Sequence, residues 1–580
     1  MAFHYGSDAP EIKNPFKQEG LLYLISGIII LIVGAISIIN LREQIIENGV
    51  AAGWFSLAVS LLLLTGGVHF VTKGLIKISR FYVGRGVPAS LSKNMARSEK
   101  HTKESDVYYN SQQIEQMMMG RKNLTFHEPV TLFDRMVYSI YPKFIFLPLS
   151  MRNYLHILVQ NTGYSIIGLI VYFMALLSGT VGLTLLTESS FSDWLGIALC
   201  VFLLALWTAY PLTVNKATDK NSGSGKNSQL VWVIALAVLV PAIAELLLRQ
   251  GFSFPEAPFN PTLALFSFFF IIIVVCAAGL ALAHFRTKVA DPVTEVSEFR
   301  EHWQENVHPK DFFRALDMEM ADLRYKEIPN RIYRELNPNL NMEGSMDKGS
   351  FSGDTIQEIQ PIYEKVSYPP LLEKSRLGVA IVGHSFVILA AVLLFFINQN
   401  GAGDVSTISL FNGIFYPVVL YVSGNSLLTF AHLYWGEMQF RSHLIQFQGE
   451  GTYSESKLSV GMAITDSTRS ENTVVRTSYS SWFLVTEIVT STQARSGVNT
   501  LDRPRYILSM NKADELKNHL VDQMREFLDE RELIASSASN KDGNAIQSIY
   551  AINEVAAGKE KLSELTQENK ELAYTTNEDK

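Results

Sequence analysis

The side chain best placed for chemistry inside an apolar stretch is His384, in the middle of the run from Leu377 to Ile397. An imidazole surrounded by apolar side chains needs a hydrogen-bond partner, and it can carry a proton or ligate haem. Ligation of haem by two histidines needs a second axial ligand at the same depth, and the sequence offers none. We therefore expect an interhelical hydrogen bond at His384 and predict no cofactor.

Glu245 is essentially the one carboxylate inside the apolar runs, and Arg249 follows it by one helical turn. This spacing predicts a local ion pair. Asn425 and Pro417 lie in a different run, where they could interrupt a helix around a binding site. Because transporters keep polar groups near mid-membrane, His384, Asn425 and Glu245 form the candidate intramembrane polar site.

Other spacings look reactive but lack required groups. His302, Glu305 and His308 are three residues apart, yet Pro309 interrupts a shared helix and no further histidine or cysteine is near. The glycine-rich turn ending at Lys226 lacks the glycine and hydroxyl positions of a phosphate loop. We predict no metal site, no ATP hydrolysis and no enzymatic activity.

Histidines also recur at the ends of three apolar runs, at His69, His284 and His432. We expect them at the lipid headgroup boundary, with distant duplication of a helical hairpin as the alternative. Between Val130 and Leu158, aromatic and basic residues are mixed and interrupted by prolines. That stretch is either an interfacial segment or a core element of a cytoplasmic module.

These residues need long apolar elements to position them. The 580 residues are 48% hydrophobic and only 18% charged, with a mean hydropathy of +0.13, so an integral membrane protein is indicated. About 20 apolar residues cross a bilayer. Eight runs qualify: Leu21 to Ile39, Ala51 to Val71, Gly163 to Leu186, Trp194 to Val214, Leu230 to Leu248, Leu263 to His284, Leu377 to Ile397 and Ile408 to Tyr434.

Lysine and arginine gather on alternate sides of these runs, and basic flanks stay in the cytoplasm. Lys73, Lys77 and Arg80 follow the second run, whereas Arg42 is the only basic residue in the connection before it. We therefore expect four hairpins with short outer turns and both termini in the cytoplasm. The net charge of −7 gives no overall basic footprint, so direct nucleic-acid binding is not predicted.

The C-terminal third changes to an alternating pattern typical of strands. We predict a β-rich module from Phe440 to Met510, followed by a helix from Lys512 to Leu533. In the preceding large loop, His308-Pro309 predicts a helix start, and Asn337 to Pro370 is predicted to be a linker because it is rich in Asn, Gly, Ser and Pro.

The fold class is thus an α-helical integral membrane protein of about eight transmembrane helices in four hairpins, with a small cytoplasmic β-rich (α+β) C-terminal module. The expected divisions are a first hairpin with a cytoplasmic N-terminus (1–72), a cytoplasmic or interfacial module (73–162), a four-helix transmembrane segment (163–285), a cytoplasmic helical loop and linker (286–376), a fourth hairpin (377–434), the β-rich module with its helix (435–535) and a polar mobile tail (536–580).

Most mass outside the membrane then lies in the cytoplasm, which favours a scaffold or docking component of an inner-membrane machine. Conjugative or type IV secretion systems are the first candidates, by analogy alone. A channel or transporter and a membrane sensor or defence effector are the alternatives. Expected partners are the lipid bilayer, membrane or cytoplasmic subunits and further copies of the chain. The candidate partner surface comprises Arg469, Glu471, Arg476, Arg495 and Arg503.

Overall fold

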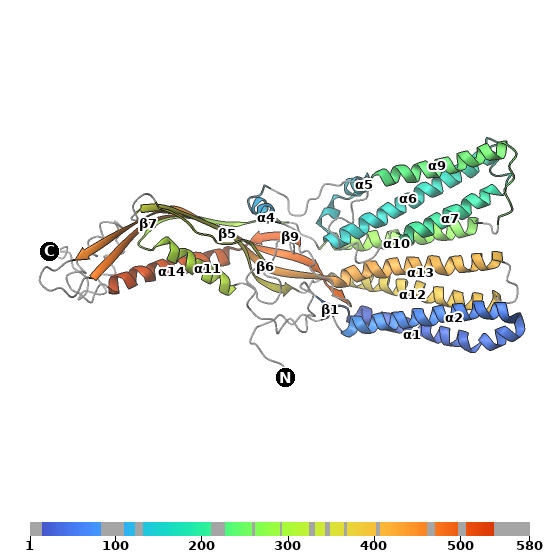
Figure 1. The fold of residues 1–580 in the computed structure, drawn as a ribbon, viewed down its shortest axis with the longest axis horizontal. Helices are drawn as coiled ribbons and strands as arrows, with labels where there is room; N and C mark the ends of the chain where they lie inside the picture. Colours follow the sequence, from blue (N-terminus) through green and yellow to red (C-terminus); the bar gives the residue numbers. More distant parts are fainter. Residues whose placement is uncertain are drawn as a thin grey trace.

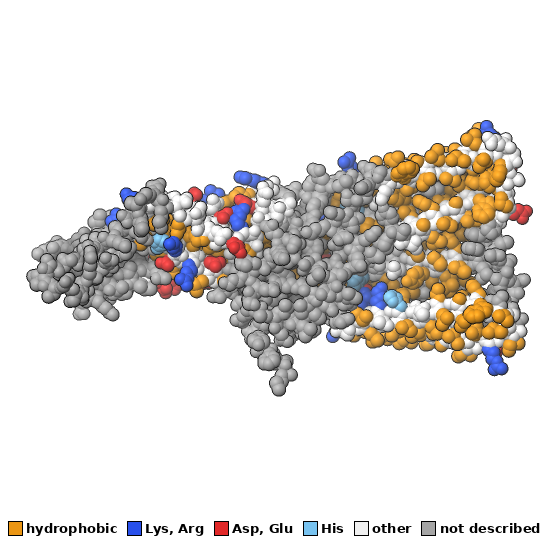
Figure 2. All heavy atoms as spheres, viewed as in Figure 1, with side chains coloured by type: hydrophobic (Ala, Val, Ile, Leu, Met, Phe, Trp, Pro, Cys, Tyr) orange, Lys and Arg blue, Asp and Glu red, His pale blue; other side chains and the backbone are white. Residues whose placement is uncertain are grey.

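The molecule is elongated, with a bundle of apolar helices at one end and an antiparallel sheet at the other (Figure 1). The computed structural model describes residues 14–79, 81–82, 110–121, 132–209, 227–257, 261–289, 293–323, 331–342, 348–364, 368–401, 407–460, 470–496 and 506–538. Hydrophobic side chains cover the visible face of the helix end, whereas charged and polar side chains are mixed among them at the sheet end (Figure 2).

Eight of the described helices are long and apolar enough to cross a membrane, as predicted. They are α1 (Lys17–Ile39), α2 (Leu41–Ser79), α6 (Leu149–Thr180), α7 (Phe191–Ala209), α9 (Asn227–Arg249), α10 (Thr262–Thr287), α12 (Pro370–Gly401) and α13 (Thr407–Gly436). In α2 the backbone turns at Gly49, where φ is +87°, and the apolar portion runs from Gly53 to Ser79.

Reciprocal glycine contacts bring two helix pairs close together. A Cβ on Gly74 of α2 would lie 2.8 Å from the carbonyl oxygen of Gly20 on α1, and one on Gly424 of α13 would lie 2.8 Å from that of Gly383 on α12. Small residues permit this approach, which is a common way for apolar helices to associate in lipid. The α12 and α13 helices lie between the α1–α2 pair and the group formed by α6, α7, α9 and α10 (Figure 1).

The main sheet has the strand order β2-β7-β6-β5-β3, with β4 also paired to β5 and β9 to β7. Its two longest strands, β6 and β7, form a continuous antiparallel ladder of 24 residues each. The strands are β2 (Ser297–Glu305), β3 (Arg331–Arg334), β4 (Asn339–Met342), β5 (Lys348–Glu364), β6 (Glu437–Val460), β7 (Ser470–Gln493) and β9 (Tyr506–Lys512). A separate short pair joins β1 (Phe81–Tyr82) to β8 (Arg495–Ser496).

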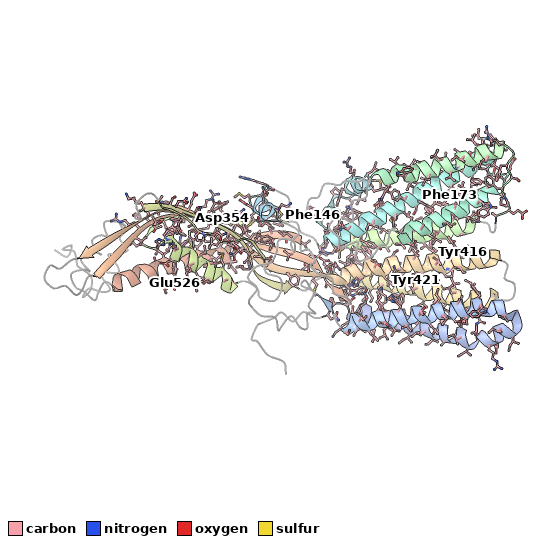
Figure 3. All side chains as sticks on the ribbon, in the orientation of Figure 1. Phe146, Phe173, Asp354, Tyr416, Tyr421 and Glu526 are labelled. Carbon is pink, nitrogen blue, oxygen red and sulfur yellow. The ribbon has the colours of Figure 1, made fainter. Side chains whose placement is uncertain are left out.

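Helices cover both faces of the sheet in different places. On one face, α11 (Pro309–Leu323) and α14 (Asp514–Ala538) enclose an aromatic core with Phe312, Phe447 and Tyr479. On the other face, α4 (Ser111–Met118) packs nearer the bundle through Ile114 and Met117. Arg334 ties α4 to the sheet by pairing with both Glu115 and Asp354, the latter labelled on β5 in Figure 3.

The sheet differs from the prediction in how much of the chain builds it. Four of its seven strands, β2 to β5, precede the predicted module. The proposed linker from Asn337 to Pro370 is wrong, because it contains β4 and β5. His302 and Glu305 lie on β2 rather than on a helix. The helix predicted to begin at His308-Pro309 is confirmed as α11. The helix predicted from Lys512 is confirmed as α14, but it begins at Asp514 because Lys512 still belongs to β9. Residues 461–469 and 497–505 of the predicted β-rich module lie outside the described residues.

The third apolar helix is also shifted from its expected position. It begins at Leu149 rather than Gly163 and ends at Thr180, so residues assigned to an interfacial module belong to the bundle. The amphipathic α5 (Leu132–Ile140) and the short η2 (Pro142–Phe146) precede it. Phe133 and Val137 of α5 are buried in the bundle core, while Met136 and Ile140 are exposed, so this segment has both a core face and an open apolar face.

Candidate functional site

Three ionisable side chains from three helices meet at the end of the bundle nearest the sheet. Glu19 lies in the first turn of α1, Lys77 in the last turn of α2 and His432 one turn before the end of α13. Their side chains are 1%, 4% and 8% exposed. A buried ion pair is costly to desolvate and is weak evidence for stability, and ionisable groups inside an apolar bundle are candidates for a functional site.

The carboxylate of Glu19 is the common acceptor of this Glu19–Lys77–His432 cluster. The ammonium of Lys77 donates to Glu19 Oε1 at 2.5 Å, and His432 Nδ1 lies 3.0 and 2.8 Å from Glu19 Oε1 and Oε2. Lys77 Nζ is also 2.9 Å from His432 Nδ1. We assign a proton to Nδ1, because this atom contacts both oxygens of the Glu19 carboxylate; in the other tautomer Nδ1 would instead accept from Lys77.

Neighbouring groups hold the cluster in place. Phe16 stacks on the His432 ring with centroids 4.8 Å apart, and its amide donates to the side chain of Asn14. The Asn14 amide donates in turn to the carbonyl oxygens of Lys77 and Ile78, which satisfies acceptors at the end of α2. The start of α1 and the end of α2 are therefore fixed together beside α13.

His384 of α12 lies next to this cluster, farther from the sheet. Its Nδ1 is 3.0 Å from Ser26 Oγ on α1, which confirms the expected interhelical hydrogen bond, and its ring meets Tyr23 edge-on at 4.7 Å. His384 Nε2 is buried without a hydrogen-bond partner among the described residues. Because Lys73 and Lys77 both lie 4.8 Å from the Tyr23 ring, the histidine and the ionic cluster share one polar environment.

A second group of buried polar side chains lies at the far end of the same helices. Ser37 Oγ of α1 contacts Ser60 Oγ of α2 at 2.7 Å and accepts a hydrogen bond from Asn398 of α12 at 3.0 Å. The intervening layer contains Ile30 and Leu63, among other buried apolar side chains. Ser26 and Ser37 are eleven residues apart, or about 16 Å along a helix, so the apolar layer separates the two polar groups.

A further buried charge pair fixes the sheet to the bundle. Glu437, the first residue of β6, accepts hydrogen bonds from Arg286 of α10 at 2.5 and 3.0 Å. Tyr368 donates to the same carboxylate at 2.6 Å and Gln439 at 3.0 Å. Burial by itself would raise the pKa of Glu437, but the Arg286 guanidinium and these hydrogen bonds hold that pKa below its usual range. Burial, with the nearby Glu437, raises the pKa of Tyr368 well above its usual range, so its hydroxyl stays a donor.

Of the three predicted intramembrane polar residues, His384 and Asn425 directly follow Gly383 and Gly424, whose backbones are in close contact between α12 and α13, whereas Glu245 lies on α9. Glu245 pairs with Arg249 at 2.9 Å, as expected, and accepts a hydrogen bond from the Leu185 amide at 2.9 Å. Asn425 is half-buried in α13, where its carbonyl accepts from Thr429. His384 is the member that lies beside the Glu19–Lys77–His432 cluster.

The predicted partner surface is described only in part. Arg476 is exposed on β7. Glu471 belongs to β7 and Arg495 to β8, but their side chains lie outside the described part of the structure, as do Arg469 and Arg503 entirely.

Glu19 and Lys77 were missed by the sequence interpretation, which treated Glu245 as the one intramembrane carboxylate and Lys77 as a cytoplasmic flank. The available signal was position. Glu19 lies two residues before one apolar run and Lys77 six residues after another, where a helix that extends past the run carries both into the bundle.

Within the described residues, no group of three or more His, Cys, Asp or Glu side chains is arranged to hold a metal ion. Comparisons with protein-family models, with curated proteins and with solved structures find no match to this chain.

Proposed function

We propose that the protein is a membrane-anchored docking platform whose sheet engages partner subunits in the cytoplasm. The observation that carries this proposal is the junction between α13 and β6, where Gly436 ends the helix and Glu437 begins the strand. The Arg286–Glu437 pair fixes this junction, and the Ala494 amide donates to the Gly436 carbonyl at 2.6 Å. A sheet mounted in this way keeps a fixed orientation relative to the helices.

The length of the sheet also supports docking. Strands of 24 residues extend roughly 80 Å, far enough to present a surface well away from the membrane. The sheet face opposite α11 and α14 carries exposed polar side chains from neighbouring strands: Arg300, His302, Glu450, Thr452 and Ser480. Trp482 lies in the same face, with Arg300 4.8 Å from its ring. A broad polar face around one aromatic residue is suited to a protein partner.

The order of the elements along the chain supports the placement of all sheet-forming segments on one side of the membrane. Two apolar helices precede β1, four separate α4 from β2, and two separate β5 from β6. If each helix crosses the membrane once, the even numbers return every sheet-forming segment to one side. The Lys and Arg bias assigns that side to the cytoplasm of an inner membrane, with helices in four hairpins and both termini inside. The machine we favour, by analogy, is a conjugative or type IV secretion apparatus.

Co-purification from the native membrane tests the platform role. The full chain is expected to elute in a large complex, and truncation after Phe440 is expected to leave the helices inserted and to abolish that complex. Because truncation also removes the central strands, the charge-reversal variant Arg300→Glu/Glu450→Lys provides a milder test on the exposed face. Glu526→Lys, at an exposed position of α14, is the matched surface control. A full-length protein that purifies alone and works unchanged after truncation would contradict the proposal.

A channel or transporter is the second candidate, because the Glu19–Lys77–His432 cluster puts buried ionisable groups inside the bundle. Flux through reconstituted vesicles would favour it over the platform.

A further inference from the structure

We propose that the Glu19–Lys77–His432 cluster is a proton-binding site that exchanges protons with the sheet side of the bundle only, and that its protonation loosens the α1–α2 pair from α13. This inference does not depend on the identity of any partner. It concerns a group of buried titratable side chains that the docking role leaves unused.

The cluster has no net charge as long as His432 is neutral. Glu19 is the single carboxylate in the cluster, and its two donors, Lys77 and the Nδ1–H of neutral His432, already lie 2.9 Å from each other. The other titratable groups near the cluster are Tyr23 on α1, Lys73 on α2, and Arg376 and His384 on α12. Glu373 on α12 adds a carboxylate beside Arg376, but its side chain is exposed.

A proton taken up from water therefore has a defined effect. When Nε2 of His432 binds it, the ring becomes an imidazolium, and two cations then share one carboxylate in a site with Lys73 and Arg376 nearby. Like charges at this distance repel strongly where water is scarce. Separation of α13 from the end of α2 relieves that repulsion, and release of the proton reverses it.

The second step is access from one side. All three members lie within about two helical turns of the helix ends that face the sheet, whereas Ile39 at the far end of α1 is 20 residues from Glu19, or about 30 Å. The buried layer of Ile30, Leu63 and Val387 lies beyond His384 and separates it from the polar group at the far end of these helices by apolar side chains. Protons reaching the cluster therefore come from the side that bears the sheet.

The third step is the mechanical link to the sheet. Phe16, which stacks on His432, belongs to a buried cluster with Trp435, Met438 and Phe440, so the start of α1 packs on the base of β6. Arg376 covers the Trp435 ring at 4.9 Å. A shift of α1 away from His432 thus alters the packing under the first residues of β6.

The test is hydrogen–deuterium exchange of the full-length protein in lipid nanodiscs from pH 8 to pH 5, corrected for intrinsic exchange. Peptides covering the start of α1 and the α13–β6 junction are expected to exchange about tenfold faster at the acidic end, through one transition that requires His432. His432→Gln should abolish the transition, and Glu19→Gln should give fast exchange at every pH. His69→Gln, an exposed histidine on α2, is the matched control and should behave as the wild type.

If a variant fails to fold, the wild-type protein still tests the proposal. Peptides of the α13–β6 junction whose protection is unchanged between pH 8 and pH 5 would overturn it. A transition that persists in His432→Gln would also overturn it. Vesicles containing a pH-sensitive dye test the one-sided access. A pH gradient should drive no proton flux above protein-free vesicles, and flux that His432→Gln removes would refute the one-sided site and favour the transporter candidate.

Discussion

At the scale of single residues, the two buried charge pairs have different surroundings. Glu437 accepts hydrogen bonds from Arg286, Tyr368 and Gln439, so its carboxylate is fully matched by donors. In the Glu19–Lys77–His432 cluster, one carboxylate serves two donors that also contact each other. The first arrangement suits a fixed attachment, and the second suits a site that changes its protonation state.

Loss of the Glu437 charge should loosen the attachment of the sheet. Glu437→Gln leaves the Arg286 guanidinium buried without a counter-charge, and we expect a loss of about 3 to 5 kcal/mol in unfolding free energy. Denaturant titration of the purified protein in detergent measures the unfolding free energy. Proteolysis at the junction between α13 and β6 reports how far the sheet has loosened. The exposed pair of Glu298 and Arg300 supplies the control, because Glu298→Gln should cost less than about 1 kcal/mol. Equal effects for the two variants would mean that Glu437 does not anchor the sheet.

At the scale of elements, the glycine contacts predict which helix positions tolerate a methyl group. A Cβ on Gly74 would lie 2.8 Å from Gly20 O and from the Leu24 amide nitrogen, whereas one on Gly66 of the same helix meets nothing within 4 Å. Gly74→Ala should therefore lower stability by about 1 to 3 kcal/mol through separation of α1 from α2. Gly66→Ala should be neutral or slightly stabilising. Thermal unfolding in one detergent compares them, and similar midpoints for the two variants would count against the packing.

The apolar helices could be predicted from the sequence because each requires only a long run of one residue class. Strand β5 could not, since Gly349 and Gly353 suggested a loop. In the structure these glycines make room for aromatic rings: a Cβ on Gly353 would lie 2.8 Å from Phe313, and one on Gly349 would lie 2.8 Å from Tyr453. The Glu19–Lys77 pair was equally hidden, because its members are 58 residues apart and only tertiary packing joins them.

At the scale of the whole molecule, the proposed topology predicts the side of each connection. Reporter fusions after Asn48, Ser190, Ala257 and Gly403 should report the outside. Those after Lys103, Lys226, Ser350 and Lys580 should report the cytoplasm, because Lys and Arg gather in these segments. Alkaline phosphatase and fluorescent-protein activities read the two sides. A reversed signal at any position would change the number of membrane crossings. The number of crossings between β5 and β6 must be even for the two strands to lie on the same side.

The pairing of β5 with β6 also constrains the order in which the protein is made. A ribosome completes β5 before α12 and α13 and starts β6 only after them, yet the two strands lie side by side in the finished sheet. Under the proposed topology, their pairing closes only when both intervening helices have entered the membrane and returned the chain. Until then β5 keeps an open edge, and such edges invite aggregation and capture by chaperones. Under this topology, the sheet is completed only after α12 and α13 have inserted correctly. A chain that inserts these two helices wrongly leaves the edge of β5 unpaired in the cytoplasm.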